Sequence, residues 1–167
     1  GNATITNASI GGDANVTSGG TLEIDQFSGV GVSAVSGTDA TFGTISAGAA
    51  ASLSTTGDLT LAMLTTGGDG TVAADGDATI TNASIGGDAN VTSGGTLTID
   101  QLNGNSVTAS GANAVLGTID AKETASLSAT GDLTLAQLTT GGDGTVAADG
   151  NATITNASIG GDANVTS

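Results

Sequence analysis

The sequence predicts an all-β fold, a parallel β-helix (solenoid) built from about nine stacked coils of about 19 residues each. Three observations predict it: a repeat within a repeat, one apolar template in every short repeat, and glycine pairs between short stretches of alternating polarity. Nothing in the composition of the 167 residues divides the chain. We therefore expect one domain over residues 1–167.

The longer repeat is a nearly identical copy. The segment Ala3–Leu22 reads ATITNASIGGDANVTSGGTL and recurs letter for letter at Ala78–Leu97. The long units cover residues 1–75, 76–149 and, as a partial copy, 150–167. They have 75 and 74 residues, and we place the missing residue near Gly31. We expect such a segment to belong to a much longer fibre.

The shorter repeat opens on an apolar residue every 17 to 19 positions. The openers are Ala3, Leu22, Ala40, Leu59, Ala78, Leu97, Ala114, Leu133 and Ala152. Two positions later stand Ile5, Ile24, Phe42, Leu61, Ile80, Ile99, Leu116, Leu135 and Ile154. Three positions further stand Ala8, Phe27, Ile45, Leu64, Ala83, Leu102, Ile119, Leu138 and Ala157. These three lines predict the core of the coil.

Two further patterns extend this template. Where the third line shrinks to Ala, an isoleucine follows two residues later, which predicts volume compensation in a packed core. These isoleucines are Ile10, Ile85 and Ile159. A fourth apolar line is assigned to Val16, Val35, Leu53, Val72, Val91, Ala109, Leu127, Val146 and Val165. Residues that change type between copies, such as Glu23 to Thr98 and Asp77 to Asn151, are expected to point outward.

The alternation of apolar and polar residues predicts short strands, and glycine pairs such as Gly11-Gly12 and Gly67-Gly68 predict corners with positive φ. One coil cannot bury its apolar face alone, so identical coils must stack in register, giving a rod of about 43 Å. A leucine-rich repeat has a similar period. It is disfavoured because neither an asparagine ladder nor a helical half-repeat is visible.

Composition excludes several classes of function. The net charge is −15 and Lys122 is the only base, so neither nucleic acid nor an anionic membrane surface is an expected partner. No apolar run is long enough to span a membrane, and no signal peptide is visible. Histidine, cysteine and tyrosine are absent. The carboxylate pair Asp75 and Asp77 has no substrate-binding aromatic ring or arginine beside it, so we expect no enzymatic activity.

Short phrases recur along the sequence, among them Gly57-Asp58-Leu59-Thr60-Leu61, Gly12-Asp13-Ala14-Asn15-Val16 and Gly95-Thr96-Leu97-Thr98-Ile99. These phrases resemble filamentous haemagglutinin-type repeats of large bacterial exoproteins, which are exported by two-partner secretion or as autotransporter-like adhesins. The resemblance covers the whole chain and implies a right-handed β-helix that is secreted or displayed at the bacterial cell surface. It also implies a fibre with a role in adhesion, aggregation or biofilm.

Two sequence patterns raise the question of a metal. The runs Gly67–Gly70 and Gly141–Gly144 are similar to calcium-binding nonapeptides, but Val72 and Val146 stand where the ligating Asp belongs. Calcium requires several converging oxygens. We therefore expect no cofactor, and leave open only weak Ca²⁺ binding between Asp residues of adjacent coils.

Glycosylation and ice binding are further hypotheses. The Asn-x-Ser/Thr sequons that could accept glycans are at Asn2, Asn7, Asn15, Asn82, Asn90, Asn151, Asn156 and Asn164. A row of outward polar pairs is read as Asn15/Thr17, Ala34/Ser36, Ser52/Ser54, Thr71/Ala73 and Asn90/Thr92. It is similar to the Thr-x-Thr arrays of ice-binding β-helices, although Ala interrupts it. Ice binding is therefore a less favoured function than a fibre.

The sequence thus favours a rigid extracellular stalk that presents other domains of the same protein to a host or neighbouring cell. Its own partners would be neighbouring repeats of the same chain. The alternative is a self-assembling filament subunit whose partners are copies of itself. In either case the acidic residues are expected to keep the rods soluble and to resist side-by-side aggregation.

Overall fold

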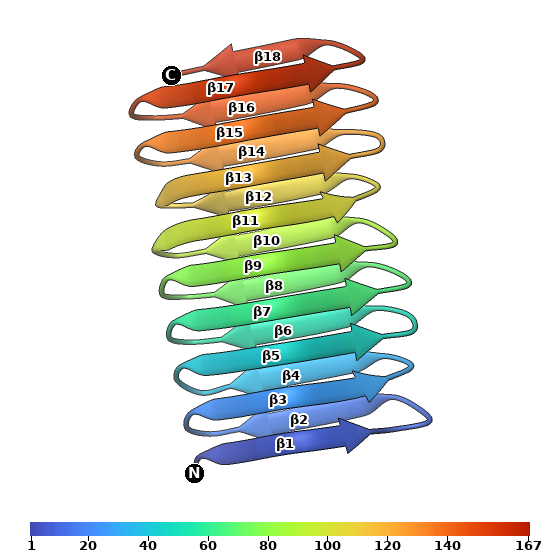
Figure 1. The fold of residues 1–167 in the computed structure, drawn as a ribbon. Helices are drawn as coiled ribbons and strands as arrows, with labels where there is room; N and C mark the ends of the chain where they lie inside the picture. The colour runs from blue at the N-terminus through green and yellow to red at the C-terminus, as the bar shows by residue number, and fades with distance from the viewer.

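A computed structural model describes all residues 1–167 as a single β-solenoid (Figure 1). Eighteen strands form two parallel sheets of nine strands each, and every coil contributes one strand to each sheet. The front strands in Figure 1 rise from left to right and the paler rear strands return, which makes the solenoid right-handed. The predicted fold of nine stacked coils is confirmed.

The two sheets differ in strand length. The long strands are β1 (Ala3–Ser9), β3 (Leu22–Gly29), β5 (Ala40–Ala47), β7 (Leu59–Thr66), β9 (Ala78–Ile85), β11 (Thr96–Gly104), β13 (Asn113–Ala121), β15 (Leu133–Thr140) and β17 (Ala152–Ile159). The short strands are β2 (Ala14–Ser18), β4 (Val32–Ser36), β6 (Ala51–Thr55), β8 (Gly70–Ala74), β10 (Ala89–Ser93), β12 (Val107–Gly111), β14 (Ala125–Ala129), β16 (Gly144–Ala148) and β18 (Ala163–Thr166). We call the two sheets the long-strand sheet and the short-strand sheet.

The coils stack in register, so each core residue lies against its counterpart one coil away. Ile24 pairs with Ile5 on one side and with Phe42 on the other. Each long strand bends once, because Asp25 and Gln26 both face outward between the buried Ile24 and Phe27. This shift in alternation explains why the second and third apolar lines are separated by three positions rather than two.

The core is a single cluster of 40 buried apolar residues that runs along the axis. Its opener line alternates strictly between Ala and Leu, so each Leu side chain is stacked between two smaller ones. Large and small residues that alternate along facing positions fill a core without voids. Phe42, the largest of the fully buried side chains, is 1% exposed.

One core assignment is wrong. Ala34 is fully buried at 0% exposure, and Val35 faces outward at 39% exposure. The shift arises at the corner before β4, where only Val30 and Gly31 separate the two strands. Counting one period of 19 residues from Val16 gives Val35, but the parallel register pairs Val16 with Ala34.

The residue missing from the second long unit is also elsewhere than predicted. The corner at Val30-Gly31 has a counterpart of equal length in Asn105-Ser106. The difference lies at the next corner. Three residues separate Ser36 from the opener Ala40, whereas only two residues separate the matched Gly111 from Ala114.

The glycine corners exist for a different reason from the one predicted. No glycine in the chain has a positive φ. Instead, successive corners stack so closely that side chains do not fit between them. A Cβ on Gly86 would lie 2.5 Å from the carbonyl oxygen of Gly67, and a Cβ on Gly160 would strike the corresponding oxygen of Gly141. Glycine is needed here for close backbone approach.

Of the isoleucines expected to compensate for a small residue, Ile85 lies in the core, whereas Ile10 in the first coil is 40% exposed. Ile85, which follows the small Ala83, is 3% exposed. Its side chain fills the space above Gly70 of the preceding coil, so a Cβ on Gly70 would collide with the Ile85 Cδ1. The same arrangement recurs in the second copy, where a Cβ on Gly144 would lie 2.7 Å from the Ile159 Cδ1.

Candidate functional surfaces

The charged residues are unevenly distributed around the coil. Four of the 16 acidic residues lie on the outer side of the long-strand sheet, and these are Glu23, Asp25, Asp100 and Asp120. All the others, together with Lys122, lie in the corners between strands. The short-strand sheet contains no charged residue. The acidic surface is therefore confined to the corners and one face.

Asp and Asn side chains in the corners form hydrogen-bonded ladders along the axis. At the corner before the long strands, the Asp77 backbone N–H donates to Asp58 Oδ1 at 2.9 Å, and the Thr96 N–H donates to Asp77 Oδ1 at 2.7 Å. Asn113 and Asp132 continue this pattern in the second copy. Each side chain thus satisfies a backbone donor of the next coil, which would otherwise need water.

A second ladder lies at the opposite corner, before the short strands. The Asp88 N–H donates to Asp69 Oδ1 at 3.0 Å, and the Ser106 N–H donates to Asp88 Oδ1 at 3.2 Å. This ladder is not apparent in the sequence, because four other residues interrupt the column: Gly31, Ala50, Ser106 and Thr124. The signal in the sequence that could have revealed these ladders is the Asp or Asn that directly precedes many of the strands.

Buried hydroxyl groups near the corners are structural. Ser36 donates to the carbonyl oxygens of Gly20 at 2.8 Å and Asp39 at 2.9 Å, and Ser93 donates to Gly76 at 2.7 Å. No buried side-chain polar atom lacks a hydrogen-bond partner. Ser36 and Ser93 thus hold the corner that connects their own short strand to the next long strand.

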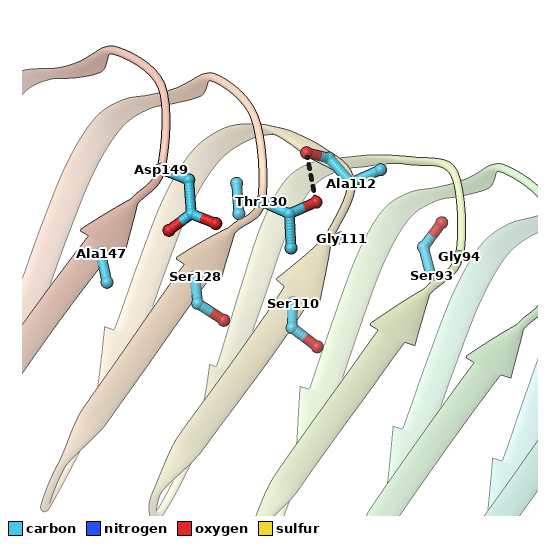
Figure 2. A pocket seen from close by; sticks show the side chains of 10 residues that line it. Ser93, Gly94, Ser110, Gly111, Ala112, Ser128, Thr130, Ala147 and Asp149 are labelled. Carbon is cyan, nitrogen blue, oxygen red and sulfur yellow. Dashed lines mark hydrogen bonds between the residues drawn. The ribbon is translucent and has the colours of Figure 1, made fainter. Parts of the chain in front are cut away.

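The surface has four depressions, and one of them lies where the coils are irregular. One groove of about 390 Å³ runs along the corner that lacks a residue, beside Gly111 and Ala112 (Figure 2). Ser110 and Ser128 project from neighbouring short strands at its edge, and the Thr130 hydroxyl donates to the Ala112 carbonyl oxygen at 3.4 Å. The groove brings together no acid–base pair and no cluster of charges, so its geometry suggests no chemistry.

The residues considered for catalysis or calcium are dispersed. Asp75 and Asp77 are both exposed, and Asp77 caps the next coil. Val72 and Val146 are core residues at 0% and 1% exposure. No three acidic residues are grouped so that they could hold a metal ion.

The sequons all lie at the surface, in three groups. Asn2 and Asn151 stand at corners, where Asn2 Oδ1 accepts a hydrogen bond from the Thr21 N–H. A second group lies at the outward bend of the long strands and comprises Asn7, Asn82 and Asn156. The third group lies on the outer side of the short-strand sheet and comprises Asn15, Asn90 and Asn164. Asn82 is half-buried and the others are exposed.

The outer side of the short-strand sheet is an uncharged surface, which we call the short-strand face. Its residues are Asn15, Thr17, Ser33, Val35, Ser52, Ser54, Thr71, Ala73, Asn90, Thr92, Thr108, Ser110, Ser126, Ser128, Thr145, Ala147, Asn164 and Thr166. The predicted pair Ala34/Ser36 is wrong, because both side chains are buried and Ser33/Val35 take the outward positions. An apolar residue therefore still interrupts the row in this coil, Val35 in place of Ala34.

Comparison with protein-family models, curated proteins and solved structures found no match to this chain. No helix of the structure has the length and apolar character needed to cross a membrane.

Proposed function

We propose that this chain is part of an extracellular structural fibre, the rigid β-helical stalk of a bacterial cell-surface adhesin. The observation that carries the proposal is the uniformity of the coils: 18 strands repeat two layers of parallel pairing from end to end. A solenoid of this kind forms a long and stiff rod, because every coil is held by its two neighbours. Such a rod holds other domains away from the surface that anchors it.

The sequence features support the same role. The repeats resemble those of filamentous haemagglutinin-type exoproteins, in which a long β-helix spaces the adhesive parts. The hydroxyl- and amide-rich surface with a net charge of −15 suits a rod that is surrounded by water. The sequons, if glycosylated, would place their glycans on the outside of this rod.

The two end coils differ from the middle coils in the exposure of their core positions. Core positions that are fully buried in the middle coils are open there, and Val165 is 54% exposed. In the stalk, further coils of the same chain cover these positions. In a filament subunit, copies of the chain cover them, and this is the alternative function, because apolar residues and unpaired strand edges favour such addition.

The mass of the intact polypeptide, measured under denaturing conditions from the native source, tests the proposal. We expect a mass many times the 15.5 kDa of this segment, with further tandem repeats in the same chain. A polypeptide close to 15.5 kDa recovered from native fibres would contradict the stalk and establish the filament subunit.

A further inference from the structure

The short-strand face is unlike any other surface of the rod, because it is free of charge over its whole length. Its 18 side chains include none that reaches further from the backbone than asparagine, and they lie in two columns along the nine short strands. In Figure 1 the strands of each sheet lie nearly parallel from one end of the rod to the other. Small side chains on such a sheet leave a surface with little relief.

The placement of the charges favours one occupant of this face, a second copy of the chain. A net charge of −15 opposes any contact that brings acidic surfaces together. The outer side of the long-strand sheet, which we call the long-strand face, carries Glu23, Asp25, Asp100 and Asp120, and both rows of corners carry Asp ladders. Two copies that meet through their short-strand faces bring no carboxylate into the interface and leave the corners at its solvated rim.

The dimensions of the face are sufficient for pairing. Nine strands of about five residues give a surface about 43 Å long and about 17 Å wide. Its area is about 700 Å² per copy, close to the roughly 800 Å² per partner of a standard interface. The contact grows with every added coil, so a longer array pairs more tightly. The identical axial repeat lets the columns of one copy lie against those of the other.

We propose that the short-strand face is a self-association surface through which two rods pair side by side. This adds lateral pairing to the proposed role as a stalk, and the charge-free face carries it independently of that role. A glycan on Asn15, Asn90 or Asn164 would block the pairing, because all three project from this face.

The test compares two variants with the same change of charge on opposite faces. The variant Thr71→Glu/Thr145→Glu places two carboxylates on the short-strand face. Its control, Thr60→Glu/Thr134→Glu, changes the same residue type in the same two coils, but on the long-strand face. Sedimentation equilibrium over a range of concentrations measures the dimer dissociation constant of each chain. Circular dichroism verifies that both variants are folded.

We expect the unmodified chain to form dimers that tighten as added salt screens the rim charges. The short-strand variant should weaken the dimer by about tenfold or more, because its carboxylates would have to be desolvated in the interface whichever way the two rods run. The control should change it by less than about twofold. An unmodified chain that stays monomeric at all concentrations, or equal weakening by both variants, would overturn the proposal.

A lysine variant distinguishes an effect at the short-strand face from an effect of the net charge of the rod. Thr71→Lys/Thr145→Lys makes the net charge less negative, so mere repulsion between rods predicts stronger dimers. Pairing through the short-strand face predicts weaker ones, because two lysines would have to be desolvated there. Stronger dimers of the lysine variant would contradict the proposal.

Solution scattering of the dimer identifies its geometry. A side-by-side pair keeps nearly the maximum dimension of one rod, whereas an end-to-end pair nearly doubles it, and the latter would overturn the proposal. Thermal hysteresis by a chain that remains monomeric would likewise assign the face to an ice surface instead.

Discussion

At the scale of single residues, glycine sets how closely the coils approach. Gly70 leaves the space that Ile85 of the next coil fills, and the second copy repeats this pair as Gly144 and Ile159. In the corresponding positions one coil earlier, Ala51 lies below the smaller Thr66. The size of one side chain is therefore matched to the size of another about 15 residues later, across the boundary between coils.

Replacing this glycine tests the matching. We expect Gly70→Ala to lower the free energy of unfolding by about 1–3 kcal/mol, because the new methyl group overpacks the Ile85 side chain. In an Ile85→Val background, which removes the Cδ1 atom, the loss should be smaller. Urea unfolding monitored by circular dichroism measures both values.

Gly48→Ala is the control for this experiment. A Cβ on Gly48 would lie 3.7 Å from its nearest neighbour, an ordinary contact, and the residue has no positive φ. The substitution should leave stability unchanged or raise it by up to about 1 kcal/mol, since alanine restricts the unfolded chain. Equal losses at Gly48 and Gly70 would show that the fold tolerates no side chain at a glycine, whatever the space.

Residue-level assignments are also where the sequence was least informative. The openers and the two lines that follow them could be predicted, since they lie within one strand and keep the strand period. Val35 was misassigned because a corner of variable length lies between the two sheets. The role of the glycines could not be inferred either, because it depends on the distance between stacked backbones.

At the scale of the elements, the corners are held by side chains that reach from one coil to the next. The carboxylate of Asp58 accepts the backbone N–H of Asp77, while the Asp58 N–H donates to Asp39. Three carboxylates in a row repel one another, and each also makes a charge-assisted hydrogen bond. The second copy replaces two of these positions with Asn113 and Asn151, which keep the geometry without the charge.

This comparison between copies predicts the effect of changing Asp58. Asp58→Ala should lower the free energy of unfolding by about 0.5–1 kcal/mol, because the Asp77 N–H loses its acceptor. Asp58→Asn should match or exceed the unmodified chain at low salt, since it keeps the Oδ1 acceptor and removes repulsion. Urea midpoints at two salt concentrations measure this, and Asn as damaging as Ala would contradict the ladder.

The hydrogen-bonded ladders are a part of the candidate surfaces that could not be predicted from the sequence. Thr21 and Thr96 interrupt one column, and Gly31, Ala50, Ser106 and Thr124 interrupt the other. No position of the repeat is therefore uniformly Asp or Asn. The uncharged short-strand face could have been predicted from the absence of acidic residues in nine short segments, once the phase of each segment was known.

At the scale of the whole molecule, the repeat makes length an additive property. Residues 1–18 and 150–167 are identical in sequence, so residues 1–149 form a unit of eight coils that begins and ends in the same phase. Copies of this unit can be joined without creating any new interface between coils. Each coil then contributes its own stability and its own rise along the axis.

The maximum dimension of such extended chains, measured by solution scattering at low concentration, tests the central claim that this protein is a rigid rod. Placing one or two further copies of residues 1–149 before the chain should lengthen it by about 38 Å per copy, because eight coils rise by about 4.8 Å each. The cross-sectional radius should stay constant. A particle that thickens as it grows, with a maximum dimension that rises far less per copy, would contradict the account.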